Sequence, residues 1–192
     1  VQVIKDPINS KGARLTAQLS VASRYLVYMD GGEHIGVSQR IEDEEERERL
    51  KAAITATIEE LAAAEPPVKR QKHAIEIPQR RGGYILRTAA EGASVDELRV
   101  DVRYLQRVWQ HLMEVKAEAA LPSCLYEELP LYKRVLRDMA STEVEKVLVD
   151  SREVLDLLVK FANKFSPEIA NLLEHYPGER PLFYLHGIED EI

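Results

Sequence analysis

Short segments of alternating or continuous apolar residues dominate the first part of the chain, and they predict strands. Alternation with polar residues covers 1–6 and 15–21, whereas 24–29, 35–41 and 84–86 are more continuously apolar. Because these segments are short and are separated by turn residues, they predict a small mixed or antiparallel sheet.

Two longer segments carry apolar residues three or four positions apart, which is the period of an amphipathic helix. Residues 43–64 begin with acidic side chains, which the helix dipole favours there. Residues 95–118 follow Ser94 and Glu97, which have the spacing of a capping box. The predicted apolar stripes are Leu50, Ile54, Ile58 and Leu61 in the first helix, and Leu98, Val102, Leu105, Trp109 and Leu112 in the second.

The remainder predicts a helix at 131–140, a strand at 144–149 and a further helix, for which Asp150 and Glu153 have capping-box spacing. The predicted fold is therefore α+β, a small mixed or antiparallel sheet packed with long amphipathic helices. With 192 residues, 45% of them hydrophobic and 31% charged, the chain can bury a core as one or two soluble domains.

Composition excludes some environments. No apolar run approaches the roughly 20 residues that span a bilayer, so no membrane contact is expected. The single cysteine, Cys124, excludes an internal disulfide and favours a reducing cytoplasm.

Charge is distributed unevenly along the chain. The net charge is −7, yet residues 1–40 carry +2 and residues 69–81 carry +4. A local basic edge on an acidic body suits a protein that grips one end of a nucleic acid better than one that tracks a long backbone. Residues 69–81 are either an RNA contact or a solvated loop, and the second is more common.

A search for catalytic motifs finds none. The five histidines lack metal-ligand spacing, and the chain has no glycine-rich phosphate loop, Gly-x-Ser-x-Gly or Cys-x-x-Cys motif. We therefore expect no catalytic residue and no metal site in this chain.

Arg87 and Thr88 stand where a predicted strand ends and a loop begins, a usual place for ligand contacts. An arginine fork, a hydroxyl and free backbone N–H groups can together bind a phosphate or another small oxyanion. The residues alone leave a commoner alternative open, in which Arg87 forms a surface ion pair and Thr88 only ends the strand.

The segment Arg87-Thr88-Ala89-Ala90-Glu91-Gly92 resembles the 5′-sensor motif of the ribonuclease E/G family. The resemblance extends over nearly the whole chain except about 65–80 and is closest to the ribonuclease G branch. Further segments that match in order and spacing are 1–7 with 11–16, 23–27, 36–42 and 134–138.

The resemblance implies a fragment of a larger enzyme. Its expected parts are the tail of an S1-domain strand and linker (1–12), the 5′-sensor region (13–130), a partial RNase-H-like region (131–180) and a linker (181–192). The family's metal-dependent cleavage uses two aspartates of a DNase-I-like domain, expected after Ile192, so Mg²⁺ is expected in the parent enzyme and not in this fragment.

The resemblance also implies the binding residues. Arg87 pairs with the terminal 5′-monophosphate, Thr88 adds its hydroxyl and backbone N–H, and Arg40 steadies Arg87 or adds charge. The backbone around Val27 supports the first nucleotide. Ser23 and Lys11 complete the set, Ser23 where the ribonuclease E branch has glycine and Lys11 where the family touches the RNA backbone. Without the resemblance, an ion pair with residues 42–46 is the favoured role of Arg40.

The expected function is an RNA-binding fragment of a single-strand-specific endoribonuclease of rRNA processing and mRNA decay, homo-oligomeric at full length and inactive alone. One alternative is a structural or oligomerisation scaffold without ligand binding. A weaker alternative is a stand-alone hydrolase.

Overall fold

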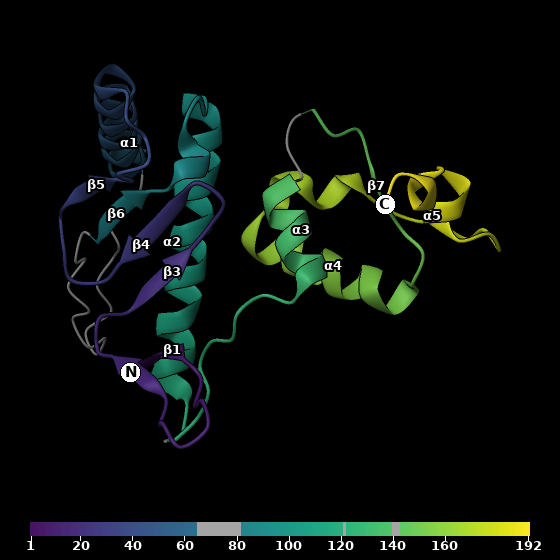
Figure 1. Cartoon of the computed structure of the whole chain (residues 1–192), viewed down its shortest axis with the longest axis horizontal. Helices are drawn as coiled ribbons and strands as arrows, with labels where there is room; N and C mark the ends of the chain where they lie inside the picture. The colour runs from purple at the N-terminus through teal and green to yellow at the C-terminus, as the bar shows by residue number, and fades with distance from the viewer. Residues whose placement is uncertain (65–81, 121, 140–142) are drawn as a thin grey trace. The chain divides into compact units, whose positions relative to one another are not determined.

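The computed structural model describes residues 1–64, 82–120, 122–139 and 143–192 (Figure 1). The predicted basic segment 69–81 lies outside the described residues. The chain divides into two compact units, Val1–Gln110 and His111–Ile192. Helices and small sheets occur together, which confirms the α+β class.

A four-stranded mixed sheet forms the centre of the first unit, in the order β3-β4-β6-β5. Strand β4 (Leu26–Met29) pairs antiparallel with both β3 (Ser20–Ala22) and β6 (Gly83–Leu86). Strand β5 (Ile35–Val37) pairs parallel with β6. Strand β6 is therefore flanked on both sides, and its buried Tyr84 and Leu86 belong to the core.

A separate antiparallel hairpin precedes this sheet, formed by β1 (Gln2–Lys5) and β2 (Arg14–Thr16). The single strand predicted at 15–21 is wrong, because β2 and β3 are distinct. The backbone N–H of Gln18 donates to the Thr16 hydroxyl at 3.1 Å, and such a local side-chain bond competes with strand pairing.

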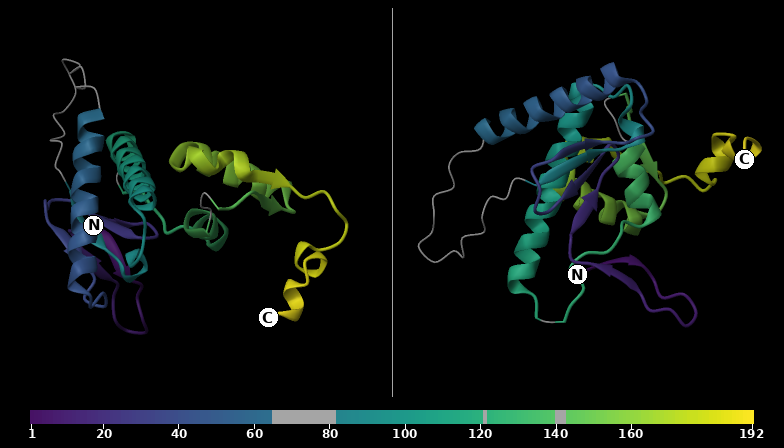
Figure 2. Two further views of the ribbon diagram at one scale, coloured as in Figure 1. Left: turned by 90° about the horizontal axis from the view of Figure 1, so that it is seen from above. Right: turned by 60° about the vertical axis from the view of Figure 1, so that its left-hand side comes forward.

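Two helices lie side by side in the first unit, and the second of them continues past Gln110. An ion pair of 2.9 Å between Arg99 and Glu60 joins them (Figure 2). Helix α1 (Glu44–Ala64) and helix α2 (Val95–Glu118) closely match the predicted segments. Most of the predicted stripe residues are buried, namely Leu50, Ile54, Leu61, Leu98, Val102, Leu105 and Leu112. The Trp109 ring packs on Tyr28 of β4 with centroids 5.0 Å apart, so α2 covers one face of the sheet.

The second unit contains a strand-helix-strand arrangement. Strand β7 (Val147–Val149) pairs parallel with β8 (Leu173–His175), and helix α4 (Arg152–Phe165) connects them through a 3₁₀ turn at Pro167–Leu172. Strand β8 is absent from the predicted elements. The predicted cap Asp150 is wrong, since Ser151 caps α4 by accepting from the Val154 N–H at 3.2 Å.

The remaining helices are short. Helix α3 (Leu131–Met139) buries Leu136, and helix α5 (Leu182–Leu185) is followed by a 3₁₀ turn at Ile188–Asp190. In the described ranges, no helix combines the length and the apolar character needed to cross a membrane.

Candidate functional site

Arg87 leaves the sheet at the end of β6, between a fully buried residue and an exposed turn. Leu86 anchors the strand in the core, whereas Arg87 and Thr88 are exposed. A 3₁₀ turn (η1, Thr88–Ala90) follows at once. The backbone N–H of Arg87 donates to the Tyr25 carbonyl at 2.8 Å, so the start of the loop is tied to the chain just before β4.

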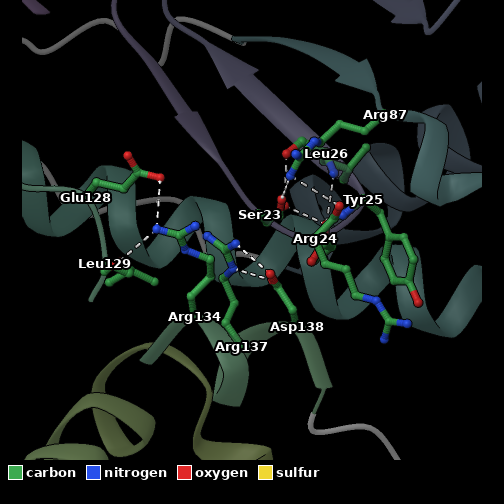
Figure 3. Close-up of polar contacts among 11 residues, drawn as sticks. Ser23, Arg24, Tyr25, Leu26, Arg87, Glu128, Leu129, Arg134, Arg137 and Asp138 are labelled. Carbon is green, nitrogen blue, oxygen red and sulfur yellow. Dashed lines mark hydrogen bonds and ion pairs between the residues drawn. The ribbon is translucent and has the colours of Figure 1, made fainter. Parts of the chain in front are cut away.

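The guanidinium of Arg87 lies against the turn formed by residues 23–26. Its Nη1 donates to the Ser23 carbonyl at 2.6 Å and approaches the Arg24 carbonyl at 3.5 Å (Figure 3). Among the described residues, the hydrogen bonds of this side chain come from Nη1. The other N–H groups of the fork are therefore available to a phosphate, which accepts two parallel hydrogen bonds from an arginine.

Thr88 and the turn after β5 meet through two hydroxyl groups. The Thr88 Oγ1 and Ser38 Oγ atoms are 3.1 Å apart, and the backbone N–H of Arg40 donates to Ser38 Oγ at 3.3 Å. The Ser38 N–H donates to the Leu86 carbonyl at 2.8 Å. The structure thus brings the Arg40 turn to the same strand end as Arg87 and Thr88.

The side chain of Arg40 is exposed, and the ion pairs formed between described residues do not include it. Residues 42–46 are all described, so the predicted alternative of an ion pair with this acidic run is not what the structure shows. Arg40 is a cation beside Thr88 whose guanidinium can turn toward an anion.

The other expected site residues have different positions. Val27 is half-buried in β4 and pairs with Ile85 of β6, directly beside the Arg87 strand end. Ser23 is the first residue of the 23–26 turn and is fully buried. Lys11 is exposed in the β1–β2 hairpin, where two backbone hydrogen bonds join it to Ile8. The described contacts do not connect Lys11 with Arg87.

Sequence reasoning missed Ser38, which belongs to this site, and Asp101, whose carboxylate accepts from the Tyr25 and Leu26 N–H groups of the 23–26 turn. Ser38 lies inside the matched segment 36–42, two positions before Arg40. Its place in that segment is the sequence signal that could have pointed to it. Asp101 is a carboxylate among the apolar positions of α2 and is only 7% exposed. A charged residue on a buried helix face is the signal that marks such a position.

Helix α1 fastens the loop that follows Thr88. The Glu46 carboxylate accepts from Arg49 at 2.6 Å and from the Gly92 backbone N–H at 2.8 Å, while Arg49 also donates to the Ala93 carbonyl. The Arg49 bond, with that from Gly92, lowers the pKa of Glu46 to about 2. Gly92 has a φ of +75°, a conformation that glycine adopts without strain.

The predicted capping box of α2 is confirmed and is linked to the same turn. Ser94 and Glu97 exchange hydrogen bonds of 2.9 and 3.2 Å between side chain and backbone. The Tyr25 hydroxyl donates to Glu97 at 2.7 Å, and this bond is the main cause of the lowered pKa of Glu97. The 23–26 turn therefore has polar contacts with α2 as well as with Arg87.

The matched segment 134–138 belongs to α3 in the second unit. Arg137 pairs with Asp138 at 2.6 Å, and Arg134 pairs with Glu128 at 3.4 Å (Figure 3). These ion pairs give that segment a structural explanation within its own unit.

Metal chemistry has no visible basis in the mapped residues. They contain no group of three or more His, Cys, Asp or Glu side chains that could hold an ion. The expectation that Mg²⁺ acts outside this chain stays a prediction.

Comparison with known proteins places the chain in a class of ribonucleases. The model of the Ribonuclease E/G family matches residues 20–192, and the chain therefore belongs to the ribonuclease E/G family. It is 45% identical to ribonuclease G of Escherichia coli and 41% identical to ribonuclease G of Haemophilus influenzae, in both cases over 192 residues and 100% of the chain. It is 30% identical to ribonuclease E of Nostoc over 186 residues, or 95% of the chain.

These matches confirm the resemblance to ribonuclease G. The chain spans 35% of the length of the two ribonuclease G relatives and 24% of that of the Nostoc protein.

Proposed function

We propose that this chain is the region of a ribonuclease-G-like endoribonuclease that recognises the 5′-monophosphate end of single-stranded RNA. The observation that carries the proposal is the strand end of β6, where the Arg87 fork, the Thr88 and Ser38 hydroxyls and the Arg40 turn come together. The parent enzyme would cleave RNA, as its relatives' name of ribonuclease suggests. We propose further that it acts on rRNA and mRNA as a metal-dependent, homo-oligomeric hydrolase.

A terminal monophosphate fits this group of donors better than a phosphate within the chain does. Its charge is close to −2 and it has three terminal oxygens, so it can occupy an arginine fork and a hydroxyl at once. A 5′-hydroxyl end offers neither the charge nor the acceptors. The protein would contribute binding and orientation of the RNA end, and cleavage would require residues outside this chain.

Replacement of the arginine tests the proposal. Arg87→Ala should weaken binding of a short RNA with a 5′-monophosphate by roughly tenfold or more, since a hydrogen-bonded contact with a charged group contributes about 1.5–3 kcal/mol. Binding of the same RNA with a 5′-hydroxyl should change little. Arg87→Lys should recover only part of the loss, because lysine keeps the charge and lacks the fork.

Fluorescence anisotropy with the two RNAs measures both affinities, and a 5′-triphosphate RNA gives a third. The matched control is Arg99→Ala, since Arg99 pairs with Glu60 on the α1–α2 side. Equal affinity of the unaltered chain for all three RNA ends would contradict the proposal.

A second candidate function is that of a structural or oligomerisation scaffold. Exposed apolar side chains in and next to the β1–β2 hairpin favour it. Val1, Val3, Ile4 and Leu15 are each more than half exposed. Such a surface suits contact with another protein segment. Sedimentation of the chain at several concentrations tests this candidate, and a strictly monomeric chain would count against oligomerisation.

A further inference from the structure

The buried carboxylate of Asp101 on α2 accepts several hydrogen bonds from the 23–26 turn, against which Arg87 lies. Asp101 is 7% exposed and Ser23 is 0% exposed. The Oδ2 atom of Asp101 accepts from the Ser23 hydroxyl at 2.5 Å, from the Tyr25 N–H at 2.8 Å and from the Leu26 N–H at 3.0 Å. A single oxygen atom thus fixes the turn from one side.

Arg87 contacts the same peptide groups from the opposite side. In a peptide group the N–H and C=O bonds point in opposite directions. When Asp101 holds the Leu26 N–H, the Tyr25 carbonyl of that peptide is directed away from Asp101, and it accepts the backbone N–H of Arg87 at 2.8 Å. Two peptide groups therefore stand between the carboxylate and the arginine.

The second of these peptide groups joins Arg24 to Tyr25. Its N–H donates to Asp101, and its carbonyl lies 3.5 Å from Nη1 of Arg87. The neighbouring Ser23 carbonyl accepts from Nη1 at 2.6 Å, while the Ser23 hydroxyl is held by Asp101. A buried negative charge polarises the peptide groups that it accepts from, which makes the carbonyls of Arg24 and Tyr25 better acceptors for Nη1 and for the backbone N–H of Arg87. The Ser23 carbonyl, which lies nearest to Nη1, is held in place through the bond of the Ser23 hydroxyl to Asp101.

We propose that Asp101 is a positioning residue for recognition of the RNA 5′-phosphate, acting through the 23–26 turn to hold the guanidinium of Arg87. The proposal rests on the function proposed above and goes beyond it, since Asp101 need not touch RNA. It predicts that loss of the carboxylate lowers selectivity for a phosphorylated end rather than affinity for RNA in general.

The test is the ratio of the affinities for 5′-monophosphate and 5′-hydroxyl forms of one short single-stranded RNA. Asp101→Asn should lower this ratio by about tenfold, the effect of about one lost hydrogen bond to a charged group. The matched control is Asp96→Asn, the same change on an exposed residue of the same helix, which pairs with Arg99. The control should leave the ratio unchanged.

A double-mutant cycle separates positioning from general loosening of the fold. If Asp101 acts through Arg87, Asp101→Asn should have no further effect on the ratio in the Arg87→Ala chain. Equal losses in both backgrounds would overturn the proposal, and so would an unchanged ratio in Asp101→Asn.

An NMR measurement without RNA distinguishes failure of this proposal from failure of the proposed function. The guanidinium N–H signal of Arg87, assigned by its loss in Arg87→Lys, should move or broaden in Asp101→Asn and stay in place in Asp96→Asn. If the unaltered chain does not discriminate RNA ends, the proposed function fails. A shifted Arg87 signal then still supports the positioning link, and an unshifted one overturns it.

A milder variant covers the case in which Asp101→Asn does not fold. Ser23→Ala removes one of the three donors and keeps the two backbone bonds to Asp101. It should lower the affinity ratio about two- to threefold. If Asp101→Asn is unfolded and Ser23→Ala keeps the full ratio and an unshifted Arg87 signal, the proposal is wrong.

Discussion

At the scale of single residues, the candidate site depends on which atoms of a side chain are already occupied. Arg87 uses Nη1 to hold the 23–26 turn, and the hydrogen bonds that its side chain forms with described residues leave the rest of the fork unused. Its placement at a strand end was predictable from the sequence, because a short apolar run and a capping box enclose it. The contacts of Asp101 were not predictable, because the donors of three of its hydrogen bonds are more than 70 positions away.

The hydroxyl of Thr88 has a test of its own. Thr88→Val keeps the shape of the side chain and removes its contact with Ser38. The affinity for 5′-monophosphate RNA should fall about two- to tenfold, since a neutral hydrogen bond contributes roughly 0.5–1.5 kcal/mol. Thr55→Val on the exposed side of α1 is the control. Titration of both RNA ends measures the effect, and an equal loss for 5′-hydroxyl RNA would argue against a phosphate contact.

Glu46 makes the stability of the site region depend on pH. Its pKa is about 2 in the folded chain against an ordinary value of 4.5. A carboxylate whose pKa is lowered by folding stabilises the fold above its unfolded pKa, and this contribution is lost as the pH falls from about 4.5 toward about 2.

Glu46→Gln should therefore lower the free energy of unfolding near neutral pH by about 1–2 kcal/mol and reduce its decline in acid. Urea unfolding at several pH values measures this, with Glu45→Gln, an exposed neighbour, as control. If both variants follow the unaltered chain, the contact of Glu46 with Arg49 and Gly92 contributes nothing to stability.

At the scale of elements, the helices were the best predicted part of the fold. The apolar stripes of α1 and α2 extend over several turns, so the period of 3.6 residues is well defined. Strands were less well predicted, because three or four residues give little alternation to detect. Strand β8 has only Leu173, Glu174 and His175, and its pairing with β7 is a tertiary contact.

The close approach of β5 and β6 makes glycine necessary at position 83. A Cβ atom at Gly83 would lie 2.9 Å from the His34 carbonyl, which belongs to the backbone and cannot rotate away. Gly83→Ala should destabilise the chain by about 1–3 kcal/mol through this overpacking. Gly36→Ala in the facing strand is the control, since its nearest contact would be an ordinary 3.6 Å with Ile85.

Thermal or urea unfolding compares the two glycine variants. If Gly83→Ala is as stable as Gly36→Ala, the sheet adapts to a methyl group and the close approach is not a constraint. If Gly83→Ala is the less stable variant, we also expect it to bind phosphate more weakly, because Arg87 and Thr88 follow the end of β6.

At the scale of the whole molecule, the net charge of −7 restricts how RNA can be bound. An acidic protein gains little from contacts spread along a phosphate backbone, so affinity has to come from a few placed cations. The resemblance to the family rested on several motifs in the right order, and no single motif would have been specific enough to indicate it. The division into units at Gln110 and His111 was not evident in the sequence, because α2 is apolar on one face along its whole length.

Salt dependence measures how many charges the RNA end engages. With about two phosphate contacts on a single strand, the logarithm of the association constant should fall against the logarithm of the salt concentration with a slope of about −1.4. Arg87→Ala should make the slope shallower by about 0.7. A much steeper slope would indicate binding along the RNA backbone, in disagreement with recognition of the end.

The bonds from Asp101 to the 23–26 turn have a consequence for exchanging parts between relatives. Position 23 and α2 are matched to each other, because the Ser23 hydroxyl and the Asp101 carboxylate fill one buried space. A chimaera that receives residues 20–30 from a relative with glycine at position 23 would leave that carboxylate one donor short. Transplantation of the 23–26 turn into another member of the family should therefore succeed only when the facing part of α2 is transplanted with it.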